Sequence, residues 1–206
     1  MSNEPTMAPQ VQSVADPAPL GLAGFALTTF VLSVVNAGLL PKPGEPVVLG
    51  LAFAYGGLAQ FCAGMWEFKR NNTFGATAFT SYGAFWIAFA LLVTFNVANI
   101  PSEARPAAVG TFLLAWGIFT GYMTVAATTL SRPVLVVFIL LTITFFVLAI
   151  GAFSSQAGLT ALGGYLGLLT AFAAWYASAI TVIASTRKSE RLRLSATYRK
   201  LVRSAA

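Results

Sequence analysis

The sequence predicts an all-α integral membrane protein with six transmembrane helices in each protomer. The first observation is composition: 57% of the 206 residues are hydrophobic and only 9% are charged, whereas ordinary globular domains contain roughly 25% charged residues. The second is the spacing of those charges, which separates long uncharged windows. The third is turn chemistry between the windows, where prolines stand at positions that end or start helices.

Five uncharged windows are long enough to cross the hydrocarbon of a bilayer, which requires about 20 mostly apolar residues. The windows hold 25, 21, 32, 26 and 54 residues, and the last is divided by the sequence GAFSSQAG at 151–158. The expected spans are therefore six: 19–39, 47–67, 76–97, 107–130, 133–152 and 160–185.

The distribution of Lys and Arg predicts that both termini are cytoplasmic. Six spans place the termini on the same side, and that side holds ten basic residues, whereas the opposite loops hold only Lys42 and Arg105. Basic residues favour the cytoplasmic side of a membrane. We expect a disordered cytoplasmic arm at 1–15, a six-helix transport domain at 16–186 and a basic cytoplasmic tail at 187–206.

Residue usage argues against several classes of protein. The chain has no histidine and one cysteine, Cys62, and it lacks phosphate loops, paired acids within a span and Ser-His-Asp sets. We therefore expect no enzyme activity, no metal and no cofactor. Seven of the twelve basic residues follow the last apolar window, which favours contact with anionic membrane lipids over nucleic acid.

The stretch from Gly56 to Trp86 combines apolar segments with polar residues in an arrangement that a soluble helix pair does not need. It predicts two transmembrane helices joined by a short basic loop, with the polar side chains facing a path. Gln60 is the strongest candidate, since an amide in mid-span can donate to a carboxylate without adding charge. Simple hydrogen bonding between helices explains Gln60 equally well.

The first span carries Thr28, Thr29 and Asn36. A Thr hydroxyl often bonds its own helix backbone, so either one alone means little, but Asn36 should face protein or water because an amide is costly in lipid. Asp16 before Pro17 suits a helix N-cap. A helix N-terminus also attracts anions, although Asp16 would itself occupy part of that capacity.

Glu67 lies at the cytoplasmic end of the second span, close to Lys69 and Arg70. An ion pair at the membrane interface is the simpler interpretation, and a role in proton handling is the alternative. By composition alone, the aromatic residues Tyr82 and Trp86 are expected in the core or in an interface belt.

The stretch PAPLGL at 17–22 and the motif NTFGATAFTSYGAFW at 72–86 resemble the acetate uptake transporter family, also called the succinate-acetate permeases. The resemblance covers nearly everything from Asp16 to Ala184. It implies transport of acetate, and of succinate in some members, across a bacterial inner membrane. It also implies a homohexamer in which each protomer encloses its own path.

The family's pattern implies an apolar constriction formed by a Phe, a Tyr and a Leu, which fall on Phe25, Tyr82 and Leu141. It also implies a specificity-related small residue at Ala174 and a path-lining amide at Gln60. The chain departs from the family at Asp16, where the proline motif usually begins with Asn. An uncharged cap has therefore become an anionic one.

These observations favour proton-linked transport of small carboxylates, because a neutral acid crosses an apolar constriction far more cheaply than its anion. Glu67 and Asp16 are the candidates for proton handling. A passive acetate or anion channel is the alternative within transport. A non-transporting membrane scaffold that acts through its basic tail is the alternative from another class.

Overall fold

The computed structural model describes residues 14–41, 44 and 46–204, and side chains as far as residue 190. Within this part of the chain, six helical spans are long and apolar enough to cross a membrane. Two spans change helix type along their length, and they carry separate labels for each part. The elements are α1 (Ala18–Asn36), α2 (Pro46–Phe53), η2 (Ala54–Ala59), α3 (Gln60–Lys69), α4 (Thr73–Leu91), η3 (Leu92–Asn96), η4 (Val97–Asn99), α5 (Arg105–Ala127), α6 (Arg132–Ser154) and α7 (Ala157–Ser204).

The prediction of six spans is confirmed, and eleven of the twelve predicted helix ends lie within three residues of those observed. The predicted end of the last helix was wrong, because α7 continues without a break to Ser204. The predicted break at 151–158 is shorter than expected: only Ser155 and Gln156 separate the last two helices. Ser155 makes this turn in the left-handed conformation, with φ 53°.

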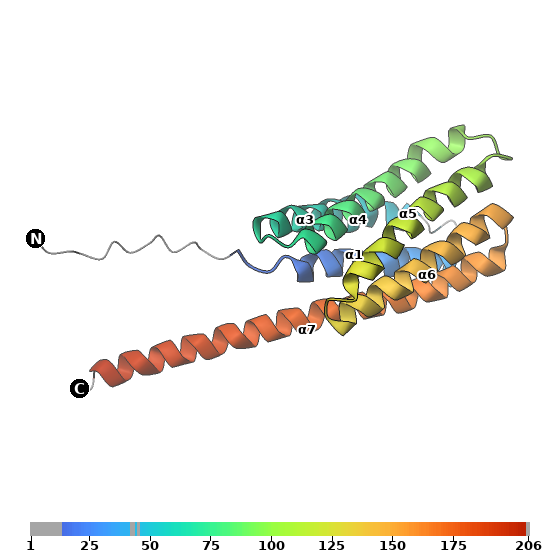
Figure 1. Ribbon diagram of the computed structural model, residues 1–206. Helices are drawn as coiled ribbons and strands as arrows, with labels where there is room; N and C mark the ends of the chain where they lie inside the picture. Colours follow the sequence, from blue (N-terminus) through green and yellow to red (C-terminus); the bar gives the residue numbers. More distant parts are fainter. Residues whose placement is uncertain (1–13, 42–43, 45, 205–206) are drawn as a thin grey trace, which may run out of the picture.

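The helices form one elongated bundle whose two ends carry different segments (Figure 1). One end, which we call the terminal face, holds Asp16 and the turn at 70–72. The other end, the loop face, holds the segment at 100–104 and the turn at 155–156. Since the chain reverses at each connection, α1, α4 and α6 run in parallel from the terminal face to the loop face.

The first and last helices of the bundle pack against each other, as α1 contacts α7 more than any other helix. The hydroxyl of Ser178 on α7 donates to the carbonyl of Pro19, 2.7 Å away. The α6 helix lies between α5 and α7, while α3 pairs with α4. The predicted arm falls mostly on residues 1–13, which lie outside the described residues.

Close helix approaches surround a π-helical segment in the second span. A Cβ atom on Gly24 of α1 would lie 2.6 Å from the carbonyl oxygen of Tyr55, and one on Gly56 would lie 2.5 Å from the hydroxyl of Thr28. Only glycine permits these contacts, so α1 lies directly against η2. Wide π-type turns within α-helices are frequent at functional sites.

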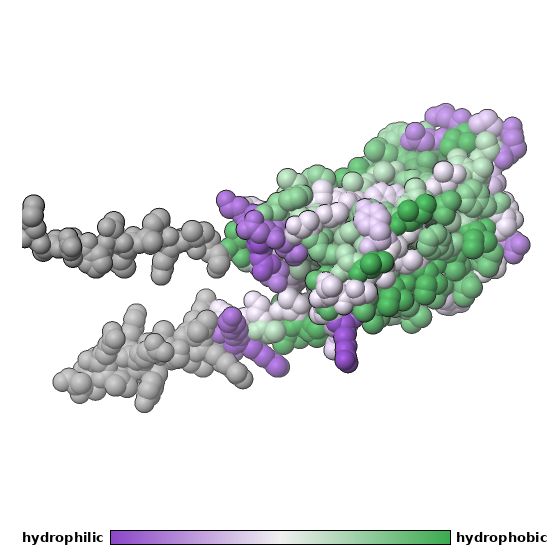
Figure 2. Space-filling model, viewed as in Figure 1, coloured by the Kyte–Doolittle hydropathy of each residue, from purple (hydrophilic) through white to green (hydrophobic). Residues whose placement is uncertain are grey.

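The outside of the bundle is apolar around its middle and hydrophilic at its ends (Figure 2). Large apolar side chains such as Ile118, Val125, Ile150 and Phe172 are more than 45% exposed. Exposed apolar area of this extent marks a surface that contacts lipid or protein, which supports a multi-pass membrane protein.

Candidate functional site

Three buried side chains meet inside the bundle, one from each of the three parallel helices. Phe25 of α1, Tyr82 of α4 and Leu141 of α6 are 4%, 3% and 4% exposed. The ring centroids of Phe25 and Tyr82 are 5.7 Å apart. We call these three side chains the neck.

A cavity lies on each side of the neck, and Phe25 and Leu141 line both of them. The wide cavity measures about 370 Å³ and extends toward the loop face. The narrow cavity measures about 20 Å³ and lies toward the terminal face. A volume of this smaller size holds about one water molecule, whereas the wide cavity falls within the range of small-molecule sites.

The helix register explains why the neck separates the two cavities. One turn before Leu141, Val137 and Phe138 line the narrow cavity, and one turn after it, Thr144 and Phe145 line the wide cavity. The same order holds on the other two helices. Because all three helices run in one direction, a single layer of side chains stands between the two spaces.

The orientation of the Tyr82 ring is fixed by a hydrogen bond outside the neck. Its hydroxyl lies 3.0 Å from the hydroxyl of Thr120 on α5, and Thr120 in turn donates to the carbonyl of Trp116 at 2.7 Å. The polar end of Tyr82 is therefore occupied, and the ring presents its apolar part to Phe25.

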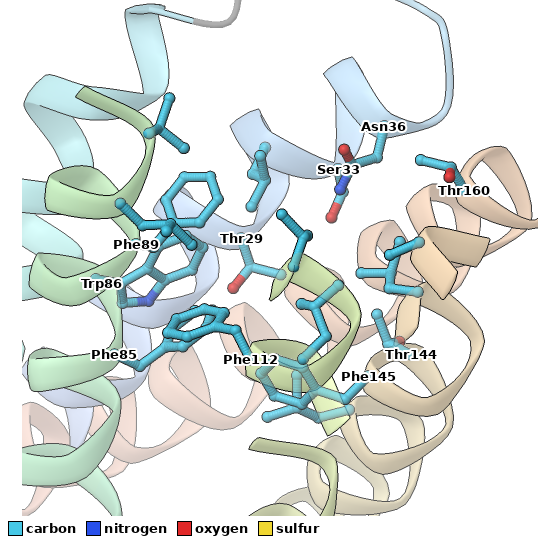
Figure 3. Close-up of a pocket in the computed structure, with 18 of the residues that line it drawn as sticks. Thr29, Ser33, Asn36, Phe85, Trp86, Phe89, Phe112, Thr144, Phe145 and Thr160 are labelled. Atoms are coloured by element: carbon cyan, nitrogen blue, oxygen red, sulfur yellow. The ribbon is translucent and has the colours of Figure 1, made fainter. Parts of the chain in front are cut away.

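Polar side chains follow one face of α1 along the wide cavity. Thr29, Ser33 and Asn36 line it, at intervals of four and three residues that place them on the same helix face. Thr144 and Thr160 face the same space from α6 and α7 (Figure 3). Asn36 therefore faces a cavity inside the protein, as predicted for an amide in an apolar span.

Gln60 begins α3 directly after the π-helical segment and lines the narrow cavity. Its side chain is 1% exposed. No described residue forms a hydrogen bond with its Oε1 atom. An unsatisfied buried polar atom costs about 1–3 kcal/mol, so this oxygen is well suited to a hydrogen-bond donor that enters the cavity, such as water or a protonated carboxyl group.

Two other predicted site residues are placed outside both cavities. Thr28 is fully buried, donates to the carbonyl of Gly24 at 2.9 Å and packs against Gly56. Ala174 is fully buried in α7 and belongs to the apolar core that also contains the neck. Their roles in substrate binding stay predictions.

At the terminal face, Asp16 connects the start of α1 to the turn between α3 and α4. Its Oδ1 atom accepts the backbone N–H of Ala18 at 3.1 Å and also pairs with the guanidinium of Arg70. The N-cap residue is Pro17 instead of Asp16, since α1 begins at Ala18. The carboxylate nevertheless occupies one free N–H group of the helix start, as expected.

Glu67 lies within one turn of this ion pair and is fully buried. The sequence did not predict this burial. Its Oε2 atom accepts a hydrogen bond from Nδ2 of Asn72 at 2.9 Å and lies 3.9 Å from Arg70. The close packing of Gly75 covers the carboxyl group. The expected pairing with basic residues is thus present, but an amide from the following turn makes the shorter contact.

The main residue that sequence reasoning missed is Trp86, which was assigned to the core. It is buried at 2% exposure, yet it also lines the wide cavity. Its position one turn after Tyr82 in the sequence TSYGAFW was the available signal. Among the described residues, no three His, Cys, Asp or Glu side chains come together in a way that could hold a metal ion.

A membrane-embedded helical bundle with two internal cavities that meet at an apolar neck defines the class of protein: one built around a transmembrane path. The profile of the GPR1/FUN34/yaaH family matches residues 2–194, and the chain belongs to this family. This confirms the resemblance carried by PAPLGL and NTFGATAFTSYGAFW.

Two relatives have names that describe transport. Acetate permease A of Emericella nidulans is 43% identical over 195 residues, a match that covers 87% of this chain and 65% of the permease. The succinate-acetate/proton symporter SatP of Escherichia coli (strain K12) is 37% identical over 163 residues, which cover 79% of this chain and 86% of the symporter. The chain spans less than two thirds of the length of the fungal relatives that it matches.

A solved structure of the bacterial acetate channel SatP has the same fold. The TM-score is 0.79 at 35% sequence identity, and the match covers 84% of this chain and 95% of the channel.

Proposed function

We propose that this chain transports acetate, and other small carboxylates such as succinate, across a membrane through the path that contains the neck. The observation that carries the proposal is the neck itself, where one apolar layer of Phe25, Tyr82 and Leu141 separates a wide cavity from a narrow one. Relatives named as an acetate permease, a succinate-acetate/proton symporter and an acetate channel support this substrate class.

The chemistry of the neck favours passage of the neutral acid. A carboxyl group with a pKa of about 4–5, like that of Glu, is mostly ionised at neutral pH. Moving the ion into an apolar layer costs far more than moving the protonated form. Polar groups on either side would collect the anion: Thr29 and Asn36 in the wide cavity and Gln60 in the narrow one.

Proton-linked passage is the leading mechanism, and Glu67 and Asp16 are the proposed proton-handling groups. Both carboxylates lie at the terminal face within one network of contacts with Arg70. Neither lines the neck, so they would act on acid that reaches or leaves this face. Ala174 is proposed to influence specificity by its small size behind the neck.

A passive anion channel is the alternative within transport, and a relative named as a channel favours it. A non-transporting scaffold is the alternative from another class. Cavities inside the bundle that carry polar side chains such as Asn36 and Gln60 argue against a scaffold, because a scaffold does not require them. The names of the relatives describe transport and not catalysis.

The membrane setting completes the proposal. We propose a bacterial inner membrane, with the terminal face in the cytoplasm, the basic end of α7 beside anionic lipids and six protomers in each assembly. No cofactor is required by this mechanism. The exposed apolar side chains around the bundle support contact with lipid and with neighbouring protomers.

The test is uptake of labelled acetate into liposomes that contain only this protein, with the proton gradient and the voltage imposed separately. Saturable uptake that the proton gradient drives against an acetate gradient would establish a symporter. Flux that follows voltage and only relaxes the acetate gradient would establish the channel. Absence of saturable acetate flux would overturn the proposed function.

A further inference from the structure

The narrow cavity is too small for the acids that the wide cavity can hold. Its volume of about 20 Å³ accommodates about one water molecule, and even a carboxylic acid with a single methyl group is larger than water. An acid that has passed the neck therefore reaches the terminal face only if this space widens. Widening requires helices to separate, and the packing of the bundle shows which helices separate most readily.

The helices form two groups that pack closely within themselves. In the first group α1 packs on α7, α7 on α6 and α6 on α5, whereas in the second group α3 packs on α4 and both contact η2. Figure 1 shows α3 and α4 on one side of the bundle and α6 and α7 on the other. The narrow cavity lies between the groups, because Leu22 and Leu141 belong to the first group and Gln60 and Ala78 to the second.

The two groups meet along α1, which contacts η2 and α3 of the second group. The contact is closest at Gly24, where an added Cβ would lie 2.6 Å from the carbonyl oxygen of Tyr55. Nearer to the terminal face, the groups meet through side chains, such as Phe74 of α4 and Phe138 of α6, whose ring centroids are 5.0 Å apart. A rotation about the close contact with η2 therefore separates the groups most at their ends, as in a hinge.

At the terminal face, an ion pair joins the two groups. Asp16 directly precedes the start of α1 in the first group, and it pairs with Arg70 in the turn that follows α3 in the second. The same Asp16 oxygen accepts the N–H of Ala18, so the pair holds the start of the helix itself. Both side chains are about one-third exposed, so water replaces this contact at low cost when the groups separate.

Glu67 keeps Arg70 on the side of the second group. Its Oε2 atom lies 3.9 Å from the guanidinium and accepts a hydrogen bond from Asn72 at 2.9 Å, while its Oε1 atom has no hydrogen-bond partner among the described residues. The side chain of Glu67 is fully buried, and loss of its cation would leave a buried carboxylate uncompensated, which is strongly unfavourable. Separation of the groups therefore breaks the exposed contact with Asp16 and preserves the buried one.

We propose that the Asp16–Arg70 ion pair is a latch that closes the path at the terminal face, and that the latch opens when the two groups rotate about the contact between α1 and η2. This inference rests on the proposed function and deepens it, since it names what controls passage between the narrow cavity and the terminal face. With the latch closed, the narrow cavity holds about one water molecule. With the latch open, the start of α1 moves away from the turn at 70–72, and the cavity widens toward this face.

The first test measures access to the narrow cavity without reference to transport. Ala78 lines this cavity and is 2% exposed, and Cys62 is the one cysteine of the chain. Ala78→Cys combined with Cys62→Ser in the full-length protein therefore places a single thiol in the cavity. The protein, embedded in lipid nanodiscs, is treated with two methanethiosulfonate reagents of opposite charge.

We expect Asp16→Asn to accelerate the reaction of this thiol with both reagents by up to about fivefold, the rate equivalent of a weak, partly exposed ion pair. Acceleration with the reagent of one charge alone would indicate a change in local potential and would overturn the latch. Equal rates with and without Asp16→Asn, including no reaction in either chain, would also overturn it.

Matched variants separate the latch from a general loss of charge. Lys69→Gln is the control, because Lys69 is exposed beside Arg70 and forms no ion pair with a described residue; it should leave the reaction rate unchanged. In a chain that carries Arg70→Gln, adding Asp16→Asn should have no further effect, because the contact is already lost. An effect of Lys69→Gln equal to that of Asp16→Asn, or a full additional effect of Asp16→Asn without Arg70, would contradict the latch.

Locking the two groups together is the opposite test. Ala15 and Lys69 are exposed next to the latch residues, and their replacement by Cys in the Cys62→Ser chain leaves Asp16 and Arg70 intact. The shortest bifunctional thiol reagent that joins the two positions through reducible bonds should stop labelled acetate flux in liposomes, and reduction should restore it. Flux that continues in fully cross-linked protein would overturn the latch.

Acetate flux and thiol access together distinguish this inference from the proposed function. Saturable acetate flux that neither the cross-link nor the latch variants change would overturn the latch and leave transport in place. Access to the narrow cavity that depends on the latch, without saturable acetate flux, would leave the latch in place and overturn transport.

Discussion

Replacement of Phe25 by Ala is the most direct perturbation of the neck, because Phe25 lines the cavities on both sides. Truncation removes the ring that now separates them and joins the two spaces. We expect the variant to conduct larger acids, such as benzoate, and to conduct acetate faster.

The expected increase in acetate flux follows from the hydration of the carboxyl group. A polar group without hydrogen bonds costs about 2–7 kcal/mol in an apolar layer. Water that accompanies the acid through the widened neck and restores one hydrogen bond would lower the barrier by about 1.4 kcal/mol, which is about a tenfold gain in flux. Loss of a buried Phe side chain costs about 3–5 kcal/mol of stability in a packed core.

The control is Phe145→Ala. Phe145 has the same 4% exposure as Phe25, but it lines only the wide cavity, one turn beyond Leu141. We expect a similar loss of stability with no new substrates. The assay compares uptake of acetate, butyrate and benzoate into liposomes, with thermal unfolding measured in parallel. If folded Phe25→Ala has the selectivity of the parent chain, the neck does not control passage.

Three further variants test other contacts. Tyr82→Phe should lower the free energy of unfolding by about 1 kcal/mol by removing the bond to Thr120, and it should preserve selectivity; a change in selectivity would show that the hydroxyl acts in passage. Gly24→Ala should destabilise the protein by about 1–3 kcal/mol, since its Cβ would meet the Tyr55 carbonyl; unchanged thermal unfolding would contradict the close contact. Asp16→Asn should lower the free energy of unfolding by at most about 1 kcal/mol, because the ion pair with Arg70 is about one-third exposed. This difference between the variant and the parent chain should vanish in 1 M salt.

The sequence predicted most of the fold because a membrane requires long uncharged windows, and the positions of charges and prolines set their limits. It did not predict the π-type turns of η2 and η3. The first lies in close contact with another helix, at Gly24 with Tyr55, and neither leaves a periodic signal in the chain. It also misplaced the end of α7, since basic residues limit a membrane span without ending a helix.

The candidate site was predicted in part, and mostly through family resemblance. Asn36 and Gln60 stood out as amides in apolar spans, but Leu141 has no feature that distinguishes it from neighbouring leucines. The complete burial of Glu67 depends on Asn72 and Gly75 from the following segment. Trp86 looked like a core residue because sequence cannot show whether a buried donor has a partner.

The pairing of α1 with α7 determines when the bundle can be completed during synthesis. Ser178 bonds to a carbonyl 159 residues earlier in the chain. At about 5–20 residues per second, the principal partner of the first helix is synthesised roughly 10–30 s after it. During this interval α1 lies in the membrane without the surface that it packs against, and a chain lacking α7 never acquires it. An incomplete chain that lacks α7 therefore leaves this face of α1 unpaired.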